Sequence, residues 1–120
     1  MIKITAEVKQ LIEENPVAFA TVDDKGKPNV NAVSCVKVVA KNNVLITDNY
    51  MKQTRENLKN NKDVCLAVWD KKWNGYKLIG RAKYFKEGKW KKFVQSLPEN
   101  KNLPAKGAIL VSISKLIKLK

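Results

Sequence analysis

Histidine is absent from this sequence, and cysteine and arginine occur only twice each, although 24 residues are basic. Without histidine there is no Ser-His or Cys-His nucleophile pair, no His-ligated metal site and no imidazole to move protons near neutral pH. Two cysteines cannot build a thiolate zinc site, so no metal site is expected. If the protein is an enzyme, an organic cofactor must therefore carry the chemistry.

Long apolar segments are missing as well. No run approaches the roughly 20 residues of a membrane span, and the N-terminal residues lack the apolar region of a secretory signal. Cys35 and Cys65 both lie within apolar, strand-like runs, as small core residues do in a reducing compartment. We therefore expect a cytoplasmic protein with no membrane segment and no disulfide between these cysteines.

The formal net charge of +13 raises the question of nucleic-acid binding. Base recognition and bidentate phosphate binding favour arginine, but Arg55 and Arg81 are the only two arginines. The lysines occur in every segment of the chain rather than in one block. We interpret the charge as a compositional bias and expect no specific nucleic-acid partner. A non-enzymatic basic binding module is the alternative function.

The 120 residues fit a single domain, 1–120, whose core needs neither disulfides nor metal. Helical periodicity predicts three short helices, around residues 5–14, 51–61 and 90–97. Six apolar or alternating segments predict strands, at 17–22, 27–40, 44–47, 64–69, 76–85 and 108–114. So many strands in so short a chain indicate a mainly β, antiparallel barrel, closed or half-closed, because closure removes free sheet edges.

The segment after the predicted strand 44–47 combines several groups that bind anions. A strand that leads into a helix leaves backbone N–H groups unpaired at the helix start, where the helix dipole is positive. Lys52, Gln53 and Thr54 add an ammonium, an amide and a hydroxyl to this turn. The turn is therefore equipped to bind a phosphate monoester. In the alternative interpretation, Asp48 or Asn49 only caps the helix and Lys52 points into water.

The predicted strand 27–40 contains two polar residues, Asn31 and Ser34, in a largely apolar run. Regular alternation places one set on one face (Val30, Ala32, Ser34, Val36 and Val38) and the other set on the opposite face (Asn31, Val33, Cys35, Lys37 and Val39). Asn31 and Ser34 either face water at a sheet edge or hydrogen-bond a ligand. A β-bulge would let both side chains reach the same ligand.

The order and spacing of these segments resemble the FMN-binding split-barrel family, the small proteins related to pyridoxamine 5′-phosphate oxidase. The similarity rests on the hairpin segment 26–30, on Val33-Ser34, on the segments 46–49 and 52–54, on Asn57-Leu58 and on the strand 64–69, and it extends through 75–76, 80–82 and 103–105. The resemblance implies a six-stranded split barrel that forms a homodimer, with one FMN at each of two sites on the subunit interface.

The resemblance also implies which residues contact the cofactor. The flavin ring would lie along one strand (Asn31, Ala32, Val33 and Ser34) and the end of another (Thr47, Asp48 and Asn49), and the phosphate would be held by Lys52, Gln53 and Thr54. Trp69, Trp73 and Tyr76 are candidates to close the ring side from the partner subunit. Aromatic residues also fill barrel ends, so these three have a structural interpretation as well.

The activity that the resemblance implies is redox chemistry on an unidentified substrate or electron partner. Full pyridoxamine phosphate oxidases carry additional arginines and histidines for the phosphorylated substrate, and haem-handling members rely on histidine, which this chain lacks. We therefore expect a small flavoprotein that transfers electrons or reduces a small molecule other than pyridoxamine phosphate. No side chain stands out as a general acid or base. Deazaflavin-dependent reductases share the fold, so a deazaflavin is the alternative cofactor.

Overall fold

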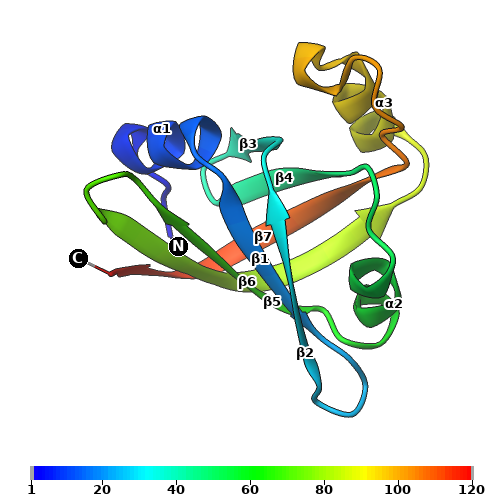
Figure 1. Cartoon of the computed structure of the whole chain (residues 1–120), viewed down its shortest axis with the longest axis horizontal. Helices are drawn as coiled ribbons and strands as arrows, with labels where there is room; N and C mark the ends of the chain where they lie inside the picture. The colour runs from blue at the N-terminus through cyan, green and yellow to red at the C-terminus, as the bar shows by residue number, and fades with distance from the viewer. Residues whose placement is uncertain (1, 120) are drawn as a thin grey trace.

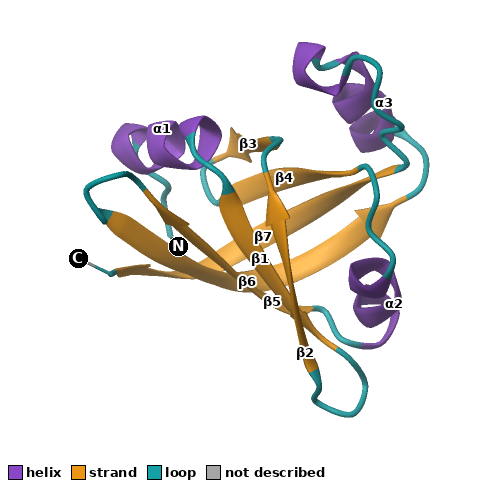
Figure 2. Cartoon of the chain, in the orientation of Figure 1, coloured by secondary structure: helices purple, strands orange, loops and turns teal. Residues whose placement is uncertain are grey.

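The computed structural model describes residues 2–119, which form one curled sheet with three α-helices around it (Figure 2). In chain order the elements are α1 (Ala6–Glu14), β1 (Val17–Val22), β2 (Pro28–Val33), β3 (Val36–Ala40), β4 (Asn43–Asp48), α2 (Gln53–Asn60), β5 (Asp63–Trp69), β6 (Gly75–Phe85), α3 (Lys89–Ser96), the 3₁₀ turn η1 (Pro98–Asn100) and β7 (Gly107–Lys118). Within this part of the chain, no helix is long and apolar enough to cross a membrane.

Seven strands build a single antiparallel sheet in the order β2-β1-β5-β6-β7-β4-β3. β2 and β3 follow each other in the chain, but they lie at opposite edges of the sheet. Only Ser34 and Cys35 separate them, so the sheet must curl until its two edges meet at this corner (Figure 1). The resulting half-barrel confirms the mainly β, split-barrel fold expected from the sequence.

The corner at Ser34 and Cys35 corrects two expectations. The sequence pattern predicts one strand over 27–40 and six strands in total, whereas the structure divides this segment into β2 and β3. The two corner residues also shift the alternation, because Val33 and Val36, expected on opposite faces, both pack in the main core. A strand that leaves one edge of a curled sheet and joins the other edge cannot keep a single alternation through the turn.

The main core fills the inside of the half-barrel, and α1 and α2 contribute to it from opposite sides (Figure 1). Val8 and Ile12 of α1 and Leu58 of α2 are at most 2% exposed and belong to the same buried cluster as Phe19. Each such side chain stabilises the fold by about 1.5–3 kcal/mol through burial. Thr5 is the N-cap of α1, because its hydroxyl accepts a hydrogen bond from the Val8 N–H at 3.3 Å.

The outside of the sheet is covered unevenly. Over β4 and β7, α3 contributes Val94 and Trp90 to a second cluster with Leu45 and Ala108. Over β2, β1, β5 and β6, seven outward residues are small or apolar and stay half-buried or exposed: Val30, Ala32, Ala18, Ala20, Cys65, Ala67 and Ile79. We refer to these seven residues as the outer apolar face. Charged residues border them on β5 and β6, where Lys77 pairs with Ala67 and Arg81 pairs with Asp63.

Candidate functional site

A pocket of about 260 Å³ lies at the corner where β2 passes into β3, and we call it the corner pocket. It is lined by Asn31, Ala32, Val33, Ser34, Cys35, Thr47, Asn49, Tyr50, Met51 and Leu103. Five consecutive residues can reach one pocket because Ser34 and Cys35 have left strand geometry. Since β2 is an edge strand, half of its backbone N–H and C=O groups also lack a partner strand and are available to a ligand.

The start of α2 is adjacent to the corner pocket, because Met51 lines the pocket and the helix begins at Gln53. Lys52 occupies the N-cap position and makes no capping hydrogen bond through its side chain. Asp48 does not cap the helix either, since it binds the N–H of Met51, at 2.8 Å, before the helix begins. Lys52 and Gln53 are exposed. The uncapped, positive end of α2 therefore lies next to the pocket.

Thr54 is fully buried, in contrast to Lys52 and Gln53. Its hydroxyl donates a hydrogen bond to Asn31 Oδ1 and accepts one from Asn29 Nδ2 at 3.2 Å. The hydroxyl proton is thus committed to the side chain of Asn31, which lines the corner pocket. In this conformation Thr54 orients a pocket residue, and its predicted contact with a phosphate stays a prediction.

Asp48 is also fully buried, and its carboxylate holds two neighbouring segments together. Oδ1 accepts from the Met51 N–H, and Oδ2 accepts from the hydroxyl of Tyr84 on β6. Burial, followed by the hydrogen bond to Asp48, raises the pKa of Tyr84 to about 12, while Arg55 opposes this shift. Tyr84 therefore stays protonated at neutral pH and donates to Asp48, which has no exposed surface of its own.

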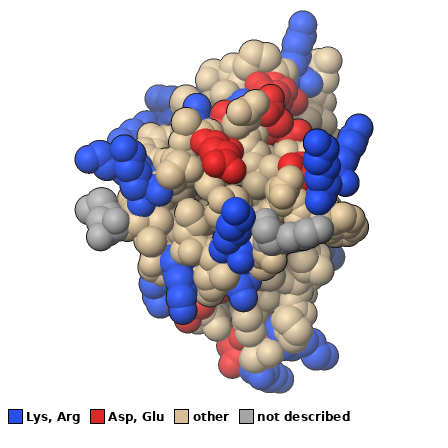
Figure 3. Space-filling view, turned by 90° about the vertical axis from the view of Figure 1, so that its left-hand side faces the viewer, with Lys and Arg blue, Asp and Glu red and all other residues tan. Residues whose placement is uncertain are grey.

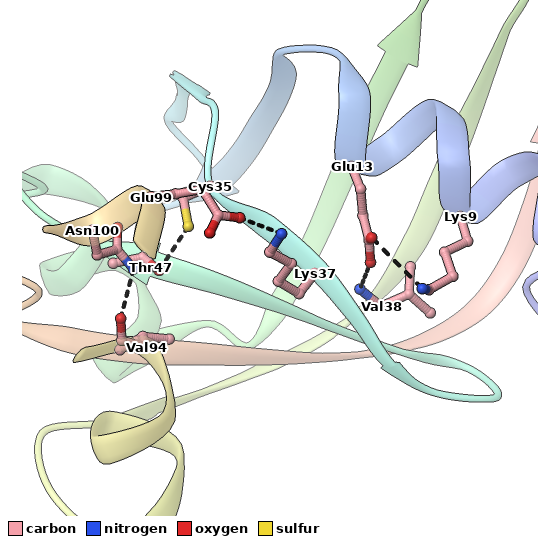
Figure 4. A network of polar contacts seen from close by, with 9 residues as sticks. All are labelled: Lys9, Glu13, Cys35, Lys37, Val38, Thr47, Val94, Glu99 and Asn100. Carbon is pink, nitrogen blue, oxygen red and sulfur yellow. Dashed lines mark hydrogen bonds and ion pairs between the residues drawn. The ribbon is translucent and has the colours of Figure 1, made fainter. Parts of the chain in front are cut away.

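Polar contacts around Asn100 fix the wall of the corner pocket formed by β4 (Figure 4). Asn100 is 3% exposed, and its Nδ2 donates to Thr47 Oγ1 at 3.0 Å and to the carbonyl of Val94 at 2.7 Å. The Thr47 hydroxyl in turn donates to Cys35 Sγ at 3.5 Å. Asn49 Oδ1 accepts from the N–H of Ala105 at 2.8 Å, which joins the loop before β7 to the same wall.

Two further contacts hold β3 at the edge of the sheet (Figure 4). Lys37 and Glu99 form an ion pair that raises the pKa of Lys37 and lowers that of Glu99. Glu13 of α1 accepts a hydrogen bond from the N–H of Val38 at 2.8 Å. Because this N–H belongs to an edge strand, the contact satisfies a donor that the sheet leaves free. The corner pocket thus has a rigid wall on its β3 and β4 side.

The aromatic candidates lie outside the corner pocket. Trp69, at the end of β5, stacks on Trp73 with ring centroids 6.2 Å apart and an interplanar angle of 7°. Trp69 is 41% exposed and Trp73 is 65% exposed. Tyr76 lines a separate cavity of about 310 Å³ between α1 and the turn that joins β5 to β6. Any contact of these three side chains with a ligand in the corner pocket would therefore come from a second copy of the chain.

The face that carries α1 and the β5–β6 turn shows how the charge is distributed (Figure 3). Acidic side chains gather in the upper part of this view, and Glu7, Glu14 and Asp70 line the cavity that contains Tyr76. Lys and Arg side chains are scattered over the view rather than gathered on one side of it. The expected absence of a specific nucleic-acid partner stays a prediction.

The corner pocket contains six of the predicted contact residues: Asn31, Ala32, Val33, Ser34, Thr47 and Asn49. Four residues that were not predicted as contacts also line it: Cys35, Tyr50, Met51 and Leu103. Cys35 and Met51 have the pattern of core residues, and Leu103 is distant in sequence, so no local signal marks them. Tyr50 is 72% exposed, and a large aromatic beside the turn predicted to bind an anion is a signal that could have identified it.

An antiparallel half-barrel with a pocket between its two edge strands has the architecture of the split-barrel flavoprotein class. The sequence model of the pyridoxamine 5′-phosphate oxidase family matches residues 4–119. This match covers nearly the whole chain, so the chain belongs to that family.

Relatives and solved structures agree with this assignment. A protein of Methanocaldococcus jannaschii with no assigned function is 34% identical over 124 residues, which cover 100% of this chain and 83% of the relative. The structure of HupZ from Group A Streptococcus has a TM-score of 0.88 and 25% identity, and covers 97% of this chain and 94% of HupZ. The structure of an FMN-binding protein of Syntrophomonas wolfei has a TM-score of 0.78 and 21% identity, and the match covers 93% of this chain and 83% of that protein.

Proposed function

We propose that this protein is a cytoplasmic FMN-binding flavoprotein that works as a homodimer in oxidoreduction or electron transfer. The observation that carries the proposal is the adjacency of the corner pocket and the uncapped start of α2. A mononucleotide requires a site for its ring beside a site for its phosphate, and we assign these roles to the pocket and to the helix start. Membership of the pyridoxamine 5′-phosphate oxidase family and the fold shared with an FMN-binding protein support it.

The residues of the corner pocket suit a flavin, which has an apolar ring with polar edges. Val33, Met51 and Leu103 offer apolar surface, while Asn31 and the free backbone groups of β2 offer hydrogen bonds. The N–H groups at the start of α2 and the ammonium of Lys52 would hold the phosphate. At about 260 Å³ the pocket is smaller than the ~300–1,000 Å³ usual for sites that enclose a ligand. One chain would therefore cover only part of the cofactor.

A bound flavin would supply transfer of a hydride or of electrons, and the chain would bind and orient it. Asn31, held by Thr54, would hydrogen-bond the polar edge of the ring. The ten lining residues include no carboxylate, histidine, lysine or arginine, and Tyr50 and Cys35 are the titratable side chains among them. Arg55 and Arg81 do not line the corner pocket either, which argues against a phosphorylated substrate such as pyridoxamine phosphate.

The outer apolar face supports the proposed homodimer. Val30, Ala20, Cys65 and Ile79 form one continuous row across four neighbouring strands, and Val30 is 64% exposed. A contiguous apolar surface on a soluble domain marks an interaction site. A second copy is the partner that we propose, because the corner pocket needs a further wall. The stacked pair Trp69–Trp73 at the end of β5 would be carried into the interface with this face.

The cofactor is tested by the absorption spectrum of the purified protein and by its unfolding in the presence of FMN, riboflavin or a deazaflavin. We expect flavin absorbance bands and a stabilisation of about 2.7 kcal/mol at a hundredfold excess of FMN over its Kd. Lys52→Ala should weaken FMN binding roughly ten- to a hundredfold and leave riboflavin, which has no phosphate, nearly unchanged. A colourless protein that none of the three ligands stabilises would contradict the proposal. Stabilisation by the deazaflavin alone would identify a deazaflavin, and not FMN, as the cofactor.

The dimer is tested by light scattering on the wild type and on two alanine-to-glutamate variants. The wild type should show about twice the 13.6 kDa chain mass. Ala20→Glu places a charge on the outer apolar face, between its cross-strand partners Val30 and Cys65, and should yield monomers, because a buried unpaired carboxylate is strongly unfavourable. Ala40→Glu, at the exposed end of β3, is the matched control and should stay dimeric. A wild type that binds FMN as a monomer would refute the assembly but leave the cofactor proposal intact.

A further inference from the structure

A third cavity, of about 480 Å³, lies between α2, the segment that joins α2 to β5, and the end of β6. It is lined by Arg55, Leu58, Lys59, Lys62, Tyr84 and Lys86, none of which lines the corner pocket. We call it the cationic cavity. Its volume is within the ~300–1,000 Å³ typical of small-molecule sites.

Four of the six lining side chains are cationic, and the fold brings them together from separate elements. Arg55 and Lys59 are one turn apart on α2 and therefore share a face of the helix. Lys62 follows the helix, and its Nζ donates to the carbonyl of Leu58 at 2.5 Å, which holds the ammonium at the helix C-terminus. Lys86 follows β6 and reaches the same cavity from the other side.

Little negative charge compensates this cluster. Lys59 pairs with Glu56 at 3.0 Å, but both side chains are more than half exposed, so solvent screens the pair. Within residues 2–119, the other three cations form no ion pair. The carboxylate behind the cavity wall, Asp48, is fully buried and is already hydrogen-bonded to Tyr84. Neighbouring like charges repel, and a bound anion would relieve this repulsion.

We propose that the cationic cavity binds a small polyanion, meaning a ligand with two or more phosphate or carboxylate groups. Arg55 can bind two oxygens with its planar guanidinium, and the three lysines add point charges around it. Arg55 is half-buried beside the Tyr84 hydroxyl, so its position is restricted by the fold. The cavity is too small for a macromolecule to enter, and its lining has no acidic group that would repel an anion.

The cationic cavity and the corner pocket are connected by one hydrogen-bonded chain. Tyr84 lines the first, Met51 lines the second, and Asp48 binds both of them. A polyanion that moves Tyr84 therefore acts on the wall of the corner pocket. Polyanion binding itself does not require a bound flavin. The proposed polyanion site and the proposed cofactor can therefore be tested independently.

Calorimetric titration of the full chain at about 0.15 M salt, with tripolyphosphate and in parallel with citrate, tests the cationic cavity. We expect one site per chain, and the stronger of the two probes identifies the class of anionic group. Arg55→Gln/Lys62→Gln should weaken binding about ten- to a hundredfold. Lys59→Gln/Lys86→Gln changes only exposed side chains, so it should weaken binding without disturbing the core.

The matched control is Lys71→Gln/Lys72→Gln on the β5–β6 turn, which lies far from α2 (Figure 1). It removes the same charge and should change affinity less than about twofold, because salt screens distant charges. Equal losses in the control and in the cavity variants would reveal diffuse attraction and overturn the site. So would the absence of binding, or a loss of probe affinity in Lys52→Ala as large as in the cavity variants, which would place the probes at the start of α2. If Arg55→Gln/Lys62→Gln does not fold, the affinity of Lys59→Gln/Lys86→Gln tests the site. Affinity equal to that of the wild type would then overturn it.

Discussion

Replacing Thr54 with valine distinguishes a residue that shapes the corner pocket from one that binds a phosphate. Valine has nearly the shape of threonine, so the substitution removes a hydroxyl and leaves almost no cavity. Thr54 is fully buried, and its hydroxyl makes two hydrogen bonds, to Asn31 Oδ1 and from Asn29 Nδ2. Each neutral hydrogen bond contributes about 0.5–1.5 kcal/mol net, so the two together should stabilise the fold by about 1–3 kcal/mol.

The assay is denaturant unfolding of the protein without cofactor, with Lys52→Ala as the control. Thr54→Val should lower the free energy of unfolding by about 1–3 kcal/mol, or the melting temperature by roughly 4 °C per kcal/mol. Lys52 is exposed and its side chain makes no capping hydrogen bond, so the free energy of unfolding of Lys52→Ala should stay within about 0.5 kcal/mol of the wild-type value. Because Asn31 loses its support, Thr54→Val should weaken FMN and riboflavin alike, whereas Lys52→Ala should weaken FMN alone.

A double-mutant cycle with Asn31→Ala isolates the contact. Thr54 and Asn31 should show a coupling energy of about 0.5–3 kcal/mol in the protein without cofactor. An unchanged unfolding free energy for Thr54→Val, together with a loss of affinity for FMN alone, would refute the structural role of Thr54. In that case the hydroxyl would be a phosphate ligand, and the hydrogen bond to Asn31 would not hold in solution.

Four further substitutions test the contacts and backbone positions that hold the fold together. Gly80→Ala should cost at least about 3 kcal/mol in denaturant unfolding, because a Cβ there would lie 2.2 Å from a backbone oxygen of β7. Gly26→Ala has open space but a φ of +84°, and should cost only about 1–2 kcal/mol; equal losses would contradict the steric argument. The folded-state pKa of Tyr84 is about 12 against 10.0 for the free group, so its contribution is complete below pH 10 and is lost as the pH rises towards 12. Unfolding measured from pH 9 to 12 should therefore show a smaller decline for Tyr84→Phe than for the wild type, and parallel curves would refute the shift. Asn100→Ala leaves buried partners unpaired and should cost about 1–3 kcal/mol, measured by thermal unfolding; an unchanged melting temperature would mean that water replaces the amide.

Most of the elements could be predicted because their signals are local. Thr5 caps α1, and Gly26 adopts a positive φ in the hairpin turn between β1 and β2, positions that threonine and glycine favour in any protein. The start of α2 was identified from Lys52 to Thr54 because a helix start exposes N–H groups in any tertiary setting. The distinction between exposed Lys52 and buried Thr54 was not predictable, since it depends on how α2 packs against Asn29 and Asn31 of β2.

By itself, the sequence determined which segments are strands and helices, because the periodicity of apolar residues and the turn residues act over a few positions. It also ruled out histidine chemistry and favoured an organic cofactor. Only the tertiary structure decided that Ser34 and Cys35 form a corner, that Leu103 joins them, and that Lys86 lies with Arg55 at one cavity. The physical reason is closure. A curled sheet brings its two edges together, and the residues that then meet are set by strand order and register, which local periodicity does not encode.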